Sequence, residues 1–328
     1  MQKVILLCLL ISLSAKAYNQ IIKGTIFDNK TKEIVYSASV YINGTSVGTL
    51  SDQNGNFKLD ISKYRSMPLT ISAIGYYSTT FKDFQAGKPL LVYLNPKTFE
   101  LDEVVVNAKA HPLQRRENLT IFRNEFLGTT SNSLNCKITN EDDIRFKYSS
   151  DRDTLRAFAT KPILIENKAL GYYITYFLDK FEYDKQSKSY FFSGNIIFNE
   201  DSTKDEKRKR LLENRRKYAY LGSRMHFFRA LWLNDLAANG FLVRNTANEA
   251  LSSDKIVFIK DSHTKYLSYH TNLGISYYTK QPTSFVIFKK SQVYFDASGY
   301  YDPSLISWEG EISRKRIADQ LPFEFFIK

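Results

Sequence analysis

Four histidines are the residues of this 328-residue chain best suited to metal or acid-base chemistry, namely His111, His226, His263 and His270. None has Glu three positions later, so the sequence lacks the His-x-x-Glu pair that presents two ligands to one Zn²⁺. His263 and His270 are seven positions apart, a spacing with no standard metal-binding meaning. Cys136 has no His near it in the sequence to activate it. The sequence therefore supports no catalytic residue, metal or cofactor. The alternative is a hydrolase whose site is assembled from distant residues of the C-terminal domain, residues 121–328.

A basic run over residues 204–217 has the charge to bind an anion. It holds eight Lys or Arg residues against three acidic residues, a net charge of +5. On a helix, Lys204, Arg208 and Arg215 share one face, and such a face attracts polyanions. For an exported chain, an anionic glycan, lipopolysaccharide or anionic lipid head groups fit better than nucleic acid. The alternative is a solvated helix face without a ligand.

Residues 223–239 predict a helix with Ser223 as its N-cap and Asn239-Gly240 as its end. Its apolar side chains cover about half of the circumference, so this face is expected to be buried. Arg224 and Asp235 fall in the middle of that face. They lie about 16 Å apart along the axis, too far to pair with each other. Because an unpaired buried charge is costly, we expect each to meet an opposite charge, in a structural ion pair or a ligand clamp.

Three side chains of this helix are the candidate ligand-binding residues: Arg224, His226 and Arg229. His226 and Arg229 are one turn apart on the narrower polar face, where together they could bind an anion. The alternative is a surface role without a ligand.

The first 17 residues predict a signal peptide. Lys3 precedes an apolar stretch, and Ala15-Lys16-Ala17 is an A-x-A cleavage site. The alternative is an uncleaved anchor. Cleavage removes two lysines and Cys8, which lowers the net charge from +12 to +10 and leaves Cys136 without a disulfide partner. We expect an exported protein with no transmembrane span after cleavage, located in the periplasm, at the outer membrane or on the cell surface.

Residues 19–107 alternate short strand patterns with turn signals. Asp28-Asn29, Asn43-Gly44 and the run from Ser51 to Phe57 are turns, because Asp and Asn bond their own backbone and Gly accepts positive φ. About seven short strands at this spacing predict a β-sandwich.

The same stretch resembles the carboxypeptidase regulatory-like domain family. The motifs are Gly24-x-Ile26-x-Asp28, Ala38-x-Val40-x-Ile42, Gly44-Thr45, Gly48-Thr49, Ser51-Asp52-x-x-Gly55-x-Phe57 and Ile71-x-x-Ile74-Gly75-Tyr76. The resemblance implies a transthyretin-like, seven-stranded sandwich, and such a regulatory module has no zinc site of its own. Leu101 to Val106 is similar to the segment that closes this domain in TonB-dependent receptors. The roughly 220 residues that follow are too few for the 22-stranded barrel of those receptors.

The rest of the chain predicts a linker at 108–120 and an α+β domain at 121–328. His111-Pro112 favours a connector, because a proline disfavours helix just before it. Long aromatic strands at 172–183 and 190–198 predict an extended hairpin, and the helices on either side of Gly222 predict a helical hairpin. The fold class is therefore β-rich with two domains.

Residues 220–231 and the later Leu321-Pro322-Phe323-Glu324 resemble the companion domain of uncharacterised envelope proteins that carry the same sandwich. We therefore expect a non-catalytic binding or assembly protein of the cell envelope, whose partner is an anionic glycan or an outer-membrane protein. An accessory protein of a TonB-dependent uptake system is a further alternative. The sequence does not indicate an oligomeric state.

Overall fold

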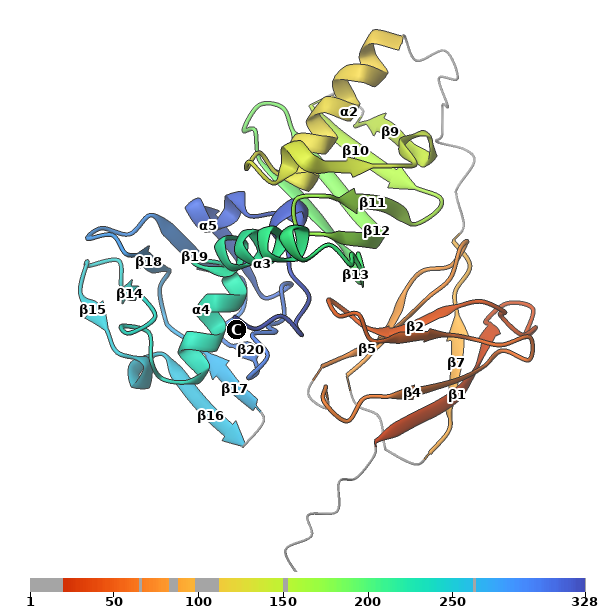
Figure 1. The fold of residues 1–328 in the computed structure, drawn as a ribbon, viewed down its shortest axis with the longest axis horizontal. Coiled ribbons are helices and arrows are strands. Elements are labelled where there is room, and N and C mark those ends of the chain that lie inside the picture. Colours follow the sequence, from red (N-terminus) through yellow and green to blue (C-terminus); the bar gives the residue numbers. More distant parts are fainter. Residues whose placement is uncertain are drawn as a thin grey trace, which may run out of the picture.

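The computed structural model describes residues 20–64, 67–82, 88–97, 112–149, 153–261 and 264–327. The predicted signal peptide at 1–17, the segment Leu101 to Val106, His111 and His263 lie outside the described residues. Figure 1 shows three groups of strands, each built around its own hydrophobic cluster.

Two sheets form the N-terminal group, with strand orders β4-β1-β7 and β3-β2-β5-β6. Alternate side chains of β1 and β4 point inward, as expected for a sheet with one buried face. Ile26, Val40, Ile71 and Val92 are fully buried between the two sheets. The predicted seven-stranded sandwich is therefore confirmed. Its strands are β1 (Ile21–Asp28), β2 (Ser39–Ile42), β3 (Gly48–Leu50), β4 (Asn56–Asp60), β5 (Leu69–Ser72), β6 (Thr79–Phe81) and β7 (Leu90–Leu94).

The second group packs a helix, α2 (Pro112–Leu127), on a six-stranded antiparallel sheet. Phe122 and Phe126 of α2 are fully buried and contact aromatic rings of the sheet. This helix corrects the expectation of a connector that runs to residue 120. Proline is accepted at the first position of a helix, where its missing N–H is not needed. The strands are β8 (Cys136–Ile138), β9 (Ile144–Tyr148), β10 (Thr154–Ala159), β11 (Ile163–Asn167), β12 (Tyr172–Asp184) and β13 (Tyr190–Glu200).

The predicted aromatic hairpin is confirmed as β12 and β13, which pair from Tyr172 with Glu200 to Tyr183 with Tyr190. The register shifts between Leu178 and Lys180, so Asp179 is the extra residue of a bulge. The helical hairpin is confirmed as α3 (Glu206–Tyr220) and α4 (Arg224–Trp232). Asp205 and Ser223 cap the two helices by accepting backbone N–H groups.

Helix α4 is shorter than expected and ends at Trp232, not at Asn239. Asn234 adopts the left-handed region with φ +56°, which an Asn tolerates and which stops the helix. The helix therefore does not include Asp235. The buried apolar face that we predicted for a helix over residues 223–239 is wrong beyond residue 232.

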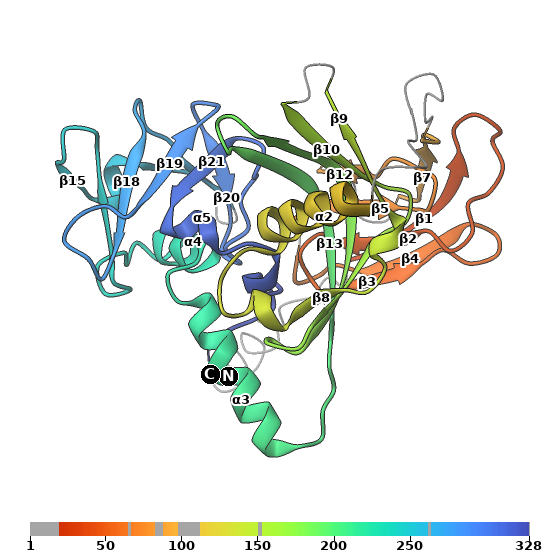
Figure 2. The ribbon, with the colours of Figure 1, turned by 90° about the horizontal axis from the view of Figure 1, so that it is seen from above.

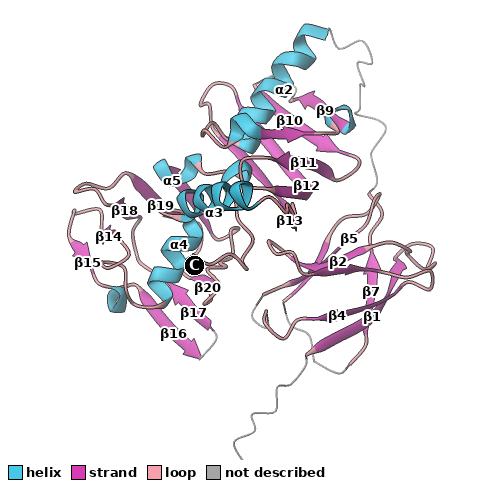
Figure 3. Ribbon diagram, in the orientation of Figure 1, coloured by secondary structure: helices cyan, strands magenta, loops and turns pink. Residues whose placement is uncertain are grey.

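The third group contains two small sheets, β15-β14-β18-β19-β21 and β16-β17-β20, with α4 against them. Phe227 and Phe228 of α4 are fully buried in this core. Figure 3 shows how strands dominate all three groups, in agreement with a β-rich fold. The elements are β14 (Phe241–Arg244), β15 (Ala250–Leu251), β16 (Val257–Asp261), β17 (Thr264–Leu267), β18 (Leu273–Tyr277), β19 (Ser284–Phe288), β20 (Val293–Phe295), β21 (Ile306–Gly310) and α5 (Glu311–Arg314).

Within the described residues, no helix is both long enough and apolar enough to cross a membrane.

Candidate functional site

Arg229, one of the three candidate residues, is buried and binds backbone carbonyls. Its guanidinium donates to the carbonyl oxygens of Ser298 at 2.8 Å, Phe323 at 3.0 Å and Phe325 at 2.6 Å. It also lies 4.2 Å from the centroid of the Phe326 ring. Only 6% of the residue is exposed. Arg229 therefore holds the C-terminal segment against α4, and its donors face protein rather than solvent.

His226 is also buried, and its two ring nitrogens have partners inside the protein. Nδ1 accepts the Gly222 N–H at 3.1 Å, which places the proton on Nε2, 3.3 Å from the side-chain oxygen of Asn239. The ring packs against Tyr220 and Phe241. Burial lowers the pKa of His226, which favours the neutral imidazole. The helix-wheel prediction of a polar, exposed face for His226 and Arg229 is therefore wrong.

Arg224 and Asp235 are not brought together, nor does either form an ion pair within the part of the chain that the structure describes. The Arg224 guanidinium lies 5.8 Å from the centroid of Trp308, and its buried Nε has no hydrogen-bond partner. Asp235 is exposed beyond the end of α4. The opposite charges expected for these two residues are therefore not observed.

A loop of the sandwich, residues 43–46, binds the free edge of β13. Gly44 N–H donates to the Ile196 carbonyl at 2.9 Å, and Phe198 N–H donates to the Thr45 carbonyl at 3.1 Å. On its other side, the Gly44 carbonyl accepts the Phe323 N–H at 2.9 Å. We call residues 43–46 the junction loop, because it joins the sandwich to both the second group and the C-terminal segment. It also covers a strand edge that would otherwise be open to pairing with another chain.

A Gly-x-Ser-x-Gly spacing, which is typical of serine hydrolases, begins in the junction loop at Gly44 and ends at Gly48. In those enzymes the serine lies on a turn from a strand into a helix. Here the spacing connects the antiparallel strands β2 and β3. The Ser46 hydroxyl donates to the Glu324 carboxylate at 2.7 Å. The local structure therefore differs from a hydrolase nucleophile elbow, and Ser46 anchors the C-terminal segment.

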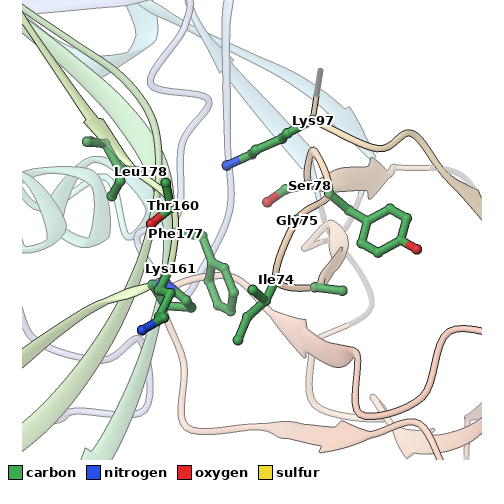
Figure 4. A pocket seen from close by; sticks show the side chains of 12 residues that line it. Ile74, Gly75, Ser78, Lys97, Thr160, Lys161, Phe177 and Leu178 are labelled. Carbon is green, nitrogen blue, oxygen red and sulfur yellow. The ribbon is translucent and has the colours of Figure 1, made fainter. Parts of the chain in front are cut away.

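A second contact region between the sandwich and the sheet of the second group encloses a small cavity (Figure 4). Lys97 extends into it from the sandwich, and Phe177 and Leu178 line the opposite wall. Its volume is about 10 Å³, enough for about one water molecule. Known small-molecule sites are far larger, roughly 300–1,000 Å³. This cavity is therefore part of an interface.

Helix α3 buries a narrow face and exposes the rest. Leu212 and Arg216 are the buried residues at its centre, and Arg216 donates to the carbonyls of Leu170 and Gly171. Arg216 also forms an ion pair with Glu200. Figure 2 shows α3 projecting from the body of the molecule, with most of its length away from the sheets. Lys204, which was expected on the same face as Arg208 and Arg215, precedes the first residue of the helix.

The outward half of α3 is the strongest charged surface that we find on a described helix. Over an arc of about 180° it carries basic side chains and no acidic ones, and Glu206 and Glu213 flank this arc on one side at 100° per residue. We call it the basic face of α3, defined by Lys207, Arg208, Arg210, Leu211, Asn214, Arg215, Lys217 and Tyr218.

Among the described residues, no group of three or more His, Cys, Asp or Glu side chains is placed to hold a metal ion. Cys136 is buried, and burial raises the pKa of its thiol to about 12.

Sequence reasoning missed the junction loop and the internal use of Arg216 and Arg229. Asn43-Gly44 was correctly identified as a turn, but a turn signal does not indicate which distant strand the loop will contact. The basic run at residues 204–217, in contrast, correctly indicated that a helix with a basic surface lies here.

Comparisons with known proteins support the resemblance of the sandwich. Residues 22–106 match the family model described as CarboxypepD_reg-like domain. A segment of 96 residues is 35% identical to the TonB-dependent receptor SusC of Bacteroides thetaiotaomicron, and it covers 29% of this chain. The match spans only 9% of the length of that receptor.

A 9R-lipoxygenase crystal structure from Cyanothece PCC8801 aligns with 70% of this chain and 49% of its own, at 11% identity and a TM-score of 0.19. That score is too low for an argument about fold or function.

Proposed function

We propose that this chain is a non-catalytic binding or assembly protein of the cell envelope, which recognises an anionic glycan or an outer-membrane partner. The observation that supports it best is the basic face of α3, where Lys207, Arg210 and Lys217 are exposed on a helix that projects from the body of the molecule (Figure 2). Such a surface attracts anionic partners and raises their rate of association.

The contrast between buried arginines and the exposed basic residues of α3 supports α3 as the binding site. Arg216 and Arg229 are both buried and donate to backbone carbonyls, so their charges serve the fold. Lys207 and Arg210, in contrast, are exposed on α3 and form no ion pair within the described ranges. These side chains are available for a partner, whereas the two polar-face candidates of α4, His226 and Arg229, are buried and bound within the protein.

The envelope location rests on two independent arguments. The first 17 residues predict a signal peptide, and the sandwich is of a type that also occurs in a TonB-dependent receptor. Because the similarity to that receptor spans only 96 residues and 9% of its length, its transport activity is not carried over to this chain.

Capture from envelope extract tests the proposal. Tagged residues 18–328 should recover a protein or an anionic glycan at low salt and lose it as salt increases, since exposed charges are screened. A variant with Lys207→Gln, Arg210→Gln and Lys217→Gln should recover less. A tagged chain with Lys23→Gln, Lys30→Gln and Lys58→Gln loses the same charge from the sandwich and is the control. Recovery of neither protein nor glycan by the unaltered chain would count against the proposal.

An accessory role in a TonB-dependent uptake system is the second candidate, favoured by the match to the SusC receptor. It predicts that the captured partner is an outer-membrane receptor and that its binding depends on the sandwich. A partner that binds equally well to a chain with an altered sandwich surface would exclude this candidate.

A further inference from the structure

The charges of α3 are segregated around its circumference. At 100° per residue, Leu212, Arg216 and Ala219 define one side of the helix, and the structure buries these three residues together with Tyr220. An arc of roughly 180°, from Lys217 round to Arg208, holds five basic residues and no acidic residue. At one end of this arc Arg208 comes next to the buried side and forms an ion pair with Asp201. The two acidic residues of the helix, Glu206 and Glu213, lie between the arc and the buried side. One side of the helix is therefore uniformly cationic.

Both acidic residues of α3 stand four positions before a basic residue. Glu206 precedes Arg210 and Glu213 precedes Lys217, a spacing and order that stabilise an isolated helix. Lys207, Arg210 and Lys217 are nevertheless exposed and form no ion pair within the described residues. Their charges are therefore open to an external anion.

Two apolar side chains lie within the basic face. Leu211 is 50% exposed and Tyr218 is 76% exposed, and they are seven positions apart on the same stripe as Arg208 and Arg215. Side chains of this kind usually pack against the body of a protein, as Leu212 does one position later. With the neighbouring cations, Leu211 and Tyr218 supply both kinds of group that a membrane interface favours: cations for anionic head groups, and apolar or amphipathic side chains for the interface.

We propose that the basic face of α3 binds the surface of an anionic lipid membrane, with the helix parallel to that surface. This inference rests on the proposed envelope function and names the partner class of the same site. Arg and Lys side chains contact the lipid phosphates, and each such cation strengthens binding to an anionic leaflet. Leu211 and Tyr218 insert among the head groups, where an amphipathic Tyr ring is favoured.

The apolar pair decides between a lipid surface and a soluble anionic glycan. A polyanionic chain in water contacts the cations and gains little from Leu211, whereas a membrane interface accepts both the cations and the leucine. The projection of α3 from the body also lets a flat surface approach the helix along its length (Figure 2).

Vesicle co-sedimentation tests the inference, with vesicles of phosphatidylcholine alone or with 30% phosphatidylglycerol as the probe. Residues 18–328 should bind the anionic vesicles and not the neutral ones, with an affinity that falls as salt increases. The triple variant Lys207→Gln, Arg210→Gln, Lys217→Gln should bind about 100-fold more weakly. The sandwich variant Lys23→Gln, Lys30→Gln, Lys58→Gln should retain the affinity of the unaltered chain. Circular dichroism melting checks that both variants fold.

A second variant, Leu211→Ser with Tyr218→Ser, separates lipid from glycan. We expect it to lose vesicle binding by about tenfold while the binding of soluble alginate stays unchanged. Equal loss in the two triple variants would overturn the site. Binding of alginate without binding of vesicles would overturn the lipid and leave the proposed function intact, whereas failure of both probes and of envelope capture would overturn both.

Discussion

Gly44 and Phe323 are in contact although they are 279 positions apart in the sequence. The Gly44 carbonyl accepts the Phe323 N–H at 2.9 Å. Gly44 has φ +79°, and a Cβ at this position would stand 2.5 Å from a Phe323 ring atom. The turn of the sandwich thus leaves no room for a side chain, because the C-terminal segment occupies the space. This contact fixes the C-terminal segment to the N-terminal sandwich.

Gly44→Ala should destabilise the protein by about 2–3 kcal/mol, because it adds left-handed strain and displaces Phe323. Gly75→Ala is the matched control, since Gly75 has φ +85° and no atom within 4 Å of an added Cβ. The control should cost about 1 kcal/mol. Urea unfolding measures both, and equal values would show that the contact with Phe323 contributes nothing.

Arg229→Lys should lower the free energy of unfolding by about 3 kcal/mol. A lysine ammonium cannot reach the three carbonyls that the guanidinium fork binds, so buried acceptors lose their donors. The C-terminal segment should also become sensitive to limited proteolysis. Arg210→Lys on the exposed face of α3 is the control and should leave both readouts unchanged. A stable, protease-resistant Arg229→Lys would contradict the anchoring role.

His226 should make the protein sensitive to acid. Burial lowers its pKa in the folded state below the ordinary 6.5, so the unfolded chain takes up the proton first. The stability that the neutral, buried His226 contributes is therefore fully present above about pH 6.5. It is lost as the pH falls from there through the folded-state pKa. His226→Gln should flatten this decrease in urea titrations between about pH 7 and pH 5. His270→Gln, at an exposed position, should not.

Cys136 should be inert in the folded protein. With a thiol pKa of about 12 and little exposure, it holds almost no thiolate at pH 8. In residues 18–328 we expect labelling by an aromatic disulfide reagent to be at least ~100-fold slower in buffer than in urea. Leu134→Cys, at a position that is 85% exposed, supplies a fast-reacting thiol for comparison. Rapid labelling of Cys136 in the native state would refute its burial.

Adjacent arginines of α3 should respond differently to the same substitution. Arg216→Gln removes donors to the carbonyls of Leu170 and Gly171 and an ion pair with Glu200, so about 2–3 kcal/mol of stability should be lost. Arg215→Gln on the basic face should change stability by less than about 0.5 kcal/mol. Thermal and urea unfolding of the two variants measure this difference, and similar effects would contradict the orientation of α3.

The sequence predicted the local features of this protein well. Strand alternation, turn residues and the family motifs were enough for the seven-stranded sandwich, and aromatic strands around a polar turn were enough for the β12–β13 hairpin. Ser223 correctly indicated the start of α4. These features depend on residues within a few positions of each other, where periodicity and turn chemistry dominate.

Tertiary structure alone decided which charges are buried. The helix wheel placed His226 and Arg229 on the polar face, yet the C-terminal segment, some 95 positions after Arg229, covers that face and supplies its carbonyls. Pro112 likewise suggested a connector, while burial of Phe122 and Phe126 against a later sheet stabilises a helix. The hydrophobic periodicity of a segment does not indicate which distant segment will pack against it. The sequence therefore determined the elements, and packing determined which surface, the basic face of α3, stays open to a partner.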